Sequence, residues 1–202
     1  MSGAIPARPG LRILNLNAGG DGKMWETVFA HGVAGPVSGE ADLARAEAAL
    51  GFPLPASYRD FCRRWGAGLA AGHVRILTPG PDPDTDLVAG AELMAHSIGA
   101  VLADHPEHRF EVEGDDPTVV ERACFFGRSE AGEFLFWDVV PDRPEYEIWV
   151  MGADLESVRF GGADLGDLLR RVQGPAVRGI LGMGAAPLPS TFAGDDPAPA
   201  TH

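Results

Sequence analysis

The stretch from Leu50 to Gly66 constrains the fold of this chain more than any other segment. A helical pattern ends at Gly51, because a glycine readily takes the left-handed conformation that closes a helix. Residues 53–55 read Pro-Leu-Pro and must be extended, and Pro55 suits the start of a new helix. An apolar stripe at helical spacing follows: Tyr58, Phe61, Cys62 and Trp65. We expect two short helices that meet at an angle set by the glycine and the prolines.

The composition is typical of one globular domain. The chain has 202 residues, of which 45% are apolar, and this is enough to bury one core. No segment approaches the roughly 18 apolar residues of a membrane span, and the first residues lack the pattern of a signal peptide. We therefore expect a cytoplasmic protein. Cys62 and Cys124 each lie in an apolar run, which predicts two core thiols rather than a disulfide or a metal site.

The negative charge is concentrated in one part of the sequence. Residues 104–167 hold 17 acidic and 5 basic residues, in a chain whose net charge is −13. A field of this sign repels nucleic acids and anionic membranes and speeds the encounter with a basic partner. The alternative is that these acidic residues serve only solubility.

Hydrophobic periodicity predicts helices, then an antiparallel sheet, then helix again. Helices are expected at 40–50 with Ser38 as N-cap, at 55–65, at 87–103 with an apolar stripe that ends at Val101, from Asp164 onward, and at 177–181. Strands are expected at 74–77, 123–126, 134–139, 146–151 and 158–160. The fold class is α+β: a single domain with a mainly antiparallel sheet packed by N-terminal helices and a C-terminal helix.

Two of these strands carry further predictions about their surroundings. The segment 134–139 is apolar on both faces and should be a central strand, whereas 146–151 alternates and should expose one face to solvent.

Both ends of the chain are predicted to lie outside the domain, which we place at 36–182. Residues 1–35 form an N-terminal extension, with a strand favoured at 11–16 and either a strand or a short helix at 24–29. Residues 183–202 contain four prolines and few large apolar side chains, which indicates a disordered tail.

No catalytic or metal-binding constellation stands out. Residues 19–23 depart from a phosphate-binding loop in their glycine spacing and in the residue after the lysine. Residues 82–86 lack the later ligands of a calcium loop, and a helix cap explains them. Three histidines, His96, His105 and His108, would meet at a zinc ion only if the loop folded back over the helix. We expect no metal and no cofactor.

The acidic half of the sequence offers a candidate protein-binding surface. Trp137 and Trp149 lie on predicted strands, and an exposed tryptophan among carboxylates would suit a cationic protein as an anchor. The alternative is that both tryptophans belong to the core beneath a solvated acidic edge. The candidate partner-binding residues are Glu111, Glu113, Asp115, Asp116, Trp137, Asp138, Asp142, Glu145 and Glu147.

The order of these motifs is similar to that of the SUKH superfamily, which includes fungal cell-wall assembly regulators and bacterial immunity proteins. The first part of the resemblance is Leu50-Gly-Phe-Pro-Leu-Pro-Ala-Ser-Tyr-Arg-Asp-Phe61, followed by Trp65-Gly66. The later part consists of Phe125-Phe-Gly, Gly132-Glu-Phe-Leu-Phe-Trp-Asp138, Glu147-Ile-Trp and Gly161-Gly-Ala-Asp-Leu-Gly-Asp-Leu-Leu169. The resemblance covers about residues 40–172.

The resemblance implies a non-enzymatic, protein-binding α+β domain. Bacterial members typically neutralise a toxin, often a nuclease or deaminase, so an immunity protein that binds a basic toxin domain is the first expectation, with no contact to nucleic acid or membrane. The alternative is a regulatory or scaffolding protein without a toxin partner. An enzyme is a more distant alternative, which would need the three histidines to converge with carboxylates. The family motifs mark the fold and leave the binding surface open.

Overall fold

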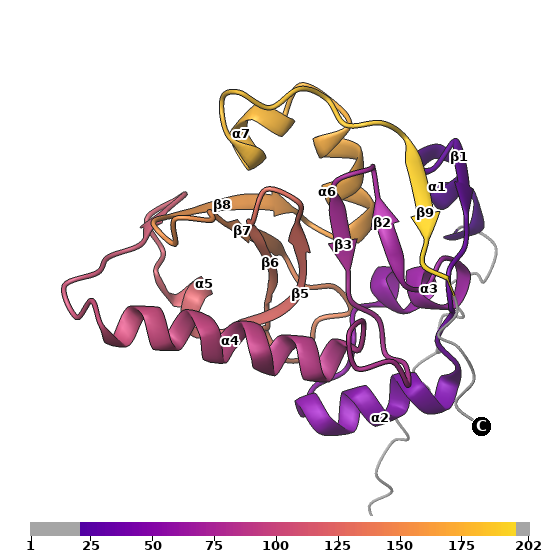
Figure 1. The fold of residues 1–202 in the computed structure, drawn as a ribbon, viewed down its shortest axis with the longest axis horizontal. Coiled ribbons are helices and arrows are strands. Elements are labelled where there is room, and N and C mark those ends of the chain that lie inside the picture. The colour runs from indigo at the N-terminus through magenta and orange to yellow at the C-terminus, as the bar shows by residue number, and fades with distance from the viewer. Residues whose placement is uncertain (1–20, 197–202) are drawn as a thin grey trace, which may run out of the picture.

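The computed structural model describes residues 21–196, which form one mixed sheet with helices packed on it (Figure 1). The helices are α1 (Asp21–Val28), α2 (Glu40–Leu50), α3 (Ala56–Arg64), α4 (Leu87–Ala103), α5 (Thr118–Glu121), α6 (Leu165–Val172) and α7 (Val177–Leu181). The strands are β1 (His31–Val33), β2 (Gly68–Ala70), β3 (Val74–Ile76), β4 (Glu111–Val112), β5 (Ala123–Ser129), β6 (Phe134–Asp138), β7 (Ile148–Met151), β8 (Ser157–Gly162) and β9 (Thr191–Gly194). The predicted α+β class is confirmed.

The sheet has the order β1-β9-β2-β3-β5-β6-β7-β8-β4. Its two outer pairs, β1 with β9 and β4 with β8, are parallel, and the strands between them pair antiparallel. β6 lies between β5 and β7, and four of its five residues are buried. Its predicted central position is therefore confirmed.

The turn between α2 and α3 follows the sequence prediction closely. Gly51 has a φ of 81°, and its N–H donates to the Glu47 carbonyl at 2.9 Å, which closes α2. Pro55 stands immediately before α3, so its missing N–H leaves no helical hydrogen bond unmade. The Tyr58 ring is fully buried and meets the Trp137 ring edge-on at 4.8 Å. The apolar stripe of α3 thus packs on the sheet.

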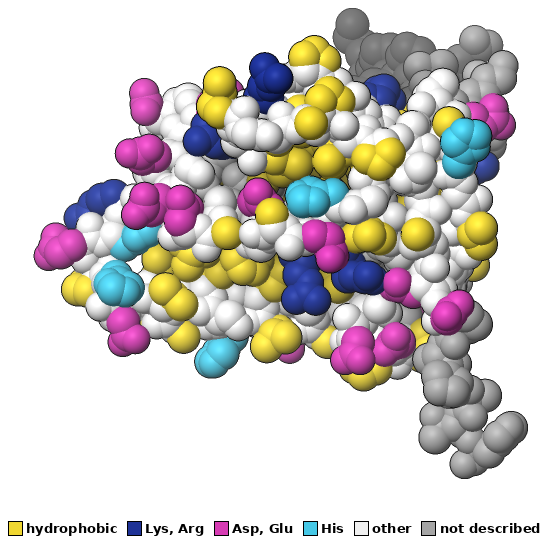
Figure 2. All heavy atoms as spheres, turned by 45° about the horizontal axis from the view of Figure 1, so that its top comes forward, with side chains coloured by type: hydrophobic (Ala, Val, Ile, Leu, Met, Phe, Trp, Pro, Cys, Tyr) yellow, Lys and Arg dark blue, Asp and Glu magenta, His cyan; other side chains and the backbone are white. Residues whose placement is uncertain are grey.

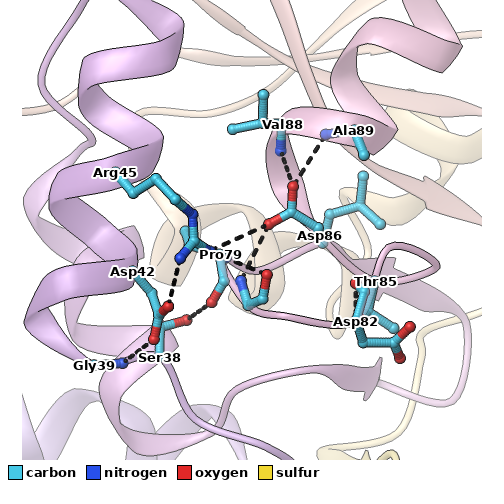
Figure 3. Close-up of polar contacts among 12 residues, drawn as sticks. Ser38, Gly39, Asp42, Arg45, Pro79, Asp82, Thr85, Asp86, Val88 and Ala89 are labelled. Atoms are coloured by element: carbon cyan, nitrogen blue, oxygen red, sulfur yellow. Dashed lines mark hydrogen bonds and ion pairs between the residues drawn. The ribbon is translucent and has the colours of Figure 1, made fainter. Parts of the chain in front are cut away.

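The predicted N-cap of α2 is wrong by one residue. The cap is Gly39, whose N–H donates to the Asp42 carboxylate at 3.1 Å. Ser38 is buried, and its hydroxyl donates instead to the Pro79 carbonyl at 2.6 Å. The serine therefore ties the start of α2 to the loop before α4, a long-range contact that helix periodicity does not reveal (Figure 3).

The acidic loop before α4 caps that helix, as predicted. The Asp86 carboxylate accepts from the N–H groups of Val88 and Ala89, each at 3.1 Å (Figure 3). The Arg45 guanidinium lies 2.9 Å from Asp42 and 3.9 Å from Asp86, so it links the first turns of α2 and α4. These contacts fix where α4 begins, and a carboxylate at the start of a helix also suits the helix dipole.

The two ends of the described chain join the same sheet, so the predicted domain bounds of 36–182 are too narrow and residues 191–194 of the predicted disordered tail form a strand. Residues 191–194 form β9, which lies between β1 and β2. Phe192 is 3% exposed, and its ring lies 5.2 Å from Phe29 and 5.2 Å from Trp65. Residues 24–29, for which the sequence allowed either a strand or a short helix, belong mostly to helix α1. The strand expected at 11–16 lies outside the described residues.

Two further expectations about exposure are wrong. All four residues of β7 are buried, so both faces of this strand are covered, and the acidic residues Glu145 and Glu147 precede it in the chain. Val101, expected in the buried stripe of α4, is 48% exposed. It lies near the C-terminal end of α4, which extends away from β5 (Figure 1).

Candidate partner-binding surface

Acidic side chains gather at one end of the molecule, on the left of the space-filling view (Figure 2). Two open depressions of about 710 and 530 Å³ are formed there by the end of α4, the connection that leads to α5, and the β7–β8 hairpin. Seven carboxylates line them, and we call this set the acidic end: Asp104, Glu107, Glu111, Glu113, Asp115, Asp154 and Glu156.

Backbone pairing brings these residues together from two distant parts of the sequence. β4 pairs in parallel with β8, so the Glu111 N–H donates to the Glu156 carbonyl at 2.8 Å. The Glu113 N–H donates to the Val158 carbonyl, also at 2.8 Å. The side chain of Val112 points into the core and is 8% exposed. The backbone of the polar connection after α4 is thus anchored to the sheet, which brings its acidic residues to the same end as those of the β7–β8 hairpin.

The negative charge of the acidic end is not neutralised within the described residues. Glu113 accepts a hydrogen bond from the Phe160 N–H at 2.9 Å, and Asp154 accepts one from the Glu156 N–H at 3.0 Å. The other five side chains make no hydrogen bond with this part of the chain, and none of the seven forms an ion pair with it. Repulsion among like charges would therefore be relieved by a cationic partner.

Two arginines also line the depressions, Arg109 and Arg159. Arg109 donates through Nη1 to the His108 carbonyl at 2.8 Å, and neither arginine forms an ion pair among the described residues. Seven carboxylates against two guanidinium groups leave the surface strongly negative.

The histidines near the acidic end have structural contacts. His108 Nε2 lies 2.8 Å from the Leu155 carbonyl, and its ring packs edge-on against Phe110 at 4.8 Å. His105 lines the smaller depression, whereas His96 is exposed on α4 and does not line it. Within residues 21–196, no group of three or more histidine, cysteine or acidic residues is placed to hold a metal ion.

The structure brings part of the predicted site together. Glu111, Glu113 and Asp115 belong to the acidic end. Asp116 follows directly, and hydrogen bonds from the hydroxyl and N–H of Thr118 lower the pKa of its carboxyl. Sequence reasoning missed four residues of this surface: Asp104, Glu107, Asp154 and Glu156. Their charge was visible, but the pairing of β4 with β8 that collects them was not.

Both tryptophans of the acidic half belong to the core, so the interpretation of an exposed anchor is wrong. Trp137 is 1% exposed and stacks on Phe126 with the ring centroids 4.3 Å apart. Trp149 is 7% exposed and packs edge-on against Phe160. Tyr58 of α3 also packs edge-on against Trp137, so side chains packed on the sheet cover this ring.

Asp138 is also internal. The residue is 7% exposed, and its carboxylate accepts from Arg122 Nε at 2.5 Å and from Arg122 Nη2 at 2.9 Å. Arg122 donates in addition to the Thr118 hydroxyl at 2.7 Å. This pair fastens α5 to the end of β6, and Asp138 is therefore not an exposed part of an acidic surface.

The remaining predicted residues lie in or next to the loop between β6 and β7, outside the two depressions. Glu145 accepts from the N–H and the hydroxyl of Ser57 at 2.7 and 2.8 Å, which places it at the start of α3. Asp142 is exposed, and Glu147 is half-buried. A contact between these residues and a partner stays a prediction.

The comparison with known families agrees with the resemblance seen in the sequence. Residues 38–171 match the SMI1 / KNR4 family (SUKH-1). The chain belongs to this family. A search of curated proteins gives no match.

The SUKH-1 match includes the acidic end and the strands β2 to β8, but not α1, β1, α7 or β9. The strands β9 and β1 therefore widen the SUKH-1 sheet at the edge opposite β4. Among the helices of residues 21–196, none combines the length and the apolarity needed to cross a bilayer.

Proposed function

We propose that this SUKH-1 protein is a non-enzymatic immunity protein that binds and neutralises a cognate bacterial toxin in the cytoplasm. The observation that carries the proposal is the acidic end, whose seven carboxylates have no ion-pair partner among the described residues. A toxin that acts on nucleic acid, such as a nuclease or deaminase, needs a basic surface to bind phosphates. Carboxylates held on a folded surface are complementary to such a site and would block it.

The arrangement favours electrostatic recognition over an apolar contact. Val101 is the large hydrophobic side chain that is exposed among the residues lining the acidic end, at 48%, whereas Val112 and Leu155 are 8% exposed. Complementary charge raises association rates and is screened by salt. We therefore expect tight binding at low ionic strength that weakens as salt is added.

Co-expression tests the proposal in the cell. The gene beside that of this protein would be expressed as the toxin, and wild-type SUKH-1 protein is expected to restore growth. A variant with Glu107→Lys, Glu111→Lys and Glu156→Lys should fail to restore growth, because it reverses the charge at three positions of the acidic end. The variant should still fold, because these three carboxylates are exposed and make no hydrogen bond among the described residues. It should still be expressed at the wild-type level.

A matched control changes the net charge by the same amount elsewhere. Glu26, Glu92 and Glu130 are exposed on α1, on α4 and at the β5–β6 turn. The variant with Lys at these three positions is expected to rescue growth. Equal rescue by both variants would refute a role for the acidic end, and absence of rescue by the wild type would favour a regulatory protein without a toxin partner.

A further inference from the structure

A second surface combines an apolar groove with two arginines. The groove has a volume of about 460 Å³ and lies between the first half of α4 and the strands β3 and β5. Leu77, Leu93 and Met94 form its apolar wall, and Arg75 and Arg128 stand on the sheet side. Basic groups are scarce in this chain, which has 16 basic and 29 acidic residues, so two of them in one groove call for an explanation.

The two arginines lie opposite each other on adjacent strands of the sheet. Arg75 and Arg128 are direct partners in the antiparallel pairing of β3 with β5, so their side chains lie on the same face. Like charges directly opposite each other on neighbouring strands destabilise the pair. An anion between them would remove this cost.

Only one of the two arginines is neutralised. Arg75 Nη1 contacts the Asp195 carboxylate at 2.9 and 2.8 Å. Arg128 is exposed and makes no hydrogen bond or ion pair through its side chain within residues 21–196. Asp84 lies on the opposite rim of the groove and forms no ion pair with either arginine within the same range. A guanidinium group is therefore available to a ligand.

The apolar wall is held in place. α4 comes so close to β3 at Gly90 that a Cβ there would lie 2.3 Å from Leu77 Cδ1. The first turn of α4 is fixed by the Asp86 cap and by Arg45 (Figure 3). Leu93, three residues after Gly90 on α4, lines the groove and is 66% exposed. A groove that is formed before binding loses little entropy when it is occupied.

We propose that this groove binds a segment of a partner protein in which an acidic side chain stands beside a large apolar one. The carboxylate pairs with Arg128 and with the Nε and Nη2 groups of Arg75, because guanidinium groups bind carboxylates in a bidentate manner. The apolar side chain packs against Leu93. This site goes beyond the toxin contact, since it selects the opposite charge. A phosphate chain would leave the apolar wall of Leu77, Leu93 and Met94 uncovered, which disfavours it as the occupant.

Peptide selection tests the site although the partner is unidentified. A phage library of random dodecapeptides is panned on the full chain, and the enriched peptides are labelled with fluorescein for anisotropy titrations. We expect an enriched Asp or Glu next to Leu, Phe or Trp. Arg128→Glu should weaken binding by about tenfold or more, which is the usual effect of replacing a charge-assisted pair with a repulsive one.

Stability separates loss of binding from loss of folding. Arg128→Glu places a carboxylate opposite Arg75, which turns a like-charge pair into an attractive one, so the melting temperature should stay or rise. Arg178→Glu is the matched control, because Arg178 is exposed on α7 and does not line the groove. It should bind the peptides as the wild type does.

Three outcomes would overturn this proposal: no enriched peptide, enrichment of neutral or basic peptides, or equal binding by the Arg128→Glu variant. A fourth is displacement of the peptide by a DNA oligonucleotide at constant ionic strength, which would indicate a phosphate site instead.

Discussion

Phe192→Ala tests whether β9 belongs to the folded core. The Phe192 side chain is 3% exposed and lies in a cluster with three aromatic rings from two other segments. Its centroid is 5.2 Å from Phe29, 5.6 Å from Phe61 and 5.2 Å from Trp65. The ring therefore fastens β9 to α1 and α3, and its removal should leave a cavity between them.

The expected cost follows from the size of the ring. A buried phenylalanine removes at least about 150 Å² from water, and about 25 cal/mol per Å² gives roughly 4 kcal/mol. This agrees with the range of about 3–5 kcal/mol for replacing a core Phe with Ala. For a chain of this length, each kcal/mol lowers the melting temperature by about 2–4 °C, so we expect a drop of roughly 8–16 °C.

Urea unfolding followed by tryptophan fluorescence measures this cost. Met183→Ala is the matched control, because Met183 lies in the same C-terminal segment but is 82% exposed. It should change the free energy of unfolding by no more than about 0.5 kcal/mol. If Phe192→Ala is as mild as this control, β9 is not packed and the prediction of a disordered tail from residue 183 was right after all.

The remaining predictions concern the two thiols and the Asp138–Arg122 ion pair. Burial raises the pKa of Cys62 and Cys124 to about 12, so both thiols should resist a disulfide reagent near pH 8 in the native protein and react once urea is added. Cys62 is buried and Cys124 partly buried, so Cys62 should be the slower of the two, and rapid reaction of Cys62 in the native state would contradict its burial. Because these thiols titrate near 9.0 when unfolded, their contribution to stability is complete below about pH 9 and is lost as the pH rises toward 12, which urea titrations at stepped pH will show. Asp138→Asn should lower the free energy of unfolding by about 2 kcal/mol, since the charged hydrogen bonds to Arg122 are lost from a buried site. Glu40→Gln, at an exposed ion pair, should cost far less, and equal costs would refute the distinction.

The helical part of the fold was predictable because its signals are local. Gly51 closes α2, Pro55 precedes α3, and Asp86 and Asp164 cap α4 and α6. Each of these residues acts on its own turn of helix, so the sequence nearby is sufficient. The longer strands β5 and β6 were also found, because five or more residues show a recognisable apolar pattern.

Four strands, β1, β2, β4 and β9, were not predictable, because they depend on pairing between distant segments. β1 and β2 both pair with β9, and β4 pairs with β8, so each of these short strands depends on a partner far away in the sequence. β9 contains one buried aromatic residue, Phe192, and the segment around it is rich in proline. The composition of this segment is typical of a disordered chain. Only the neighbouring strands make it part of the core.

The same distinction applies to the candidate site. Glu111, Glu113 and Asp115 were found from charge density alone, which depends on composition. Asp154 and Glu156 were missed, because only the parallel pairing of β4 with β8 brings their hairpin to the same end. The tryptophans were misjudged as a possible anchor, since large apolar side chains in the sequence do not reveal which strands lie inside the sheet.

The central claim is that the acidic end of this SUKH-1 protein binds a basic toxin. It is tested most directly by the affinity of the purified protein for that toxin, measured by calorimetry over a series of salt concentrations. We predict that the wild-type affinity falls steadily as salt is added. The variant with lysine at positions 107, 111 and 156 should bind weakly at every salt concentration, and the control with lysine at 26, 92 and 130 should stay close to the wild type. An affinity that does not depend on salt, or that is equal in the two variants, would contradict the claim.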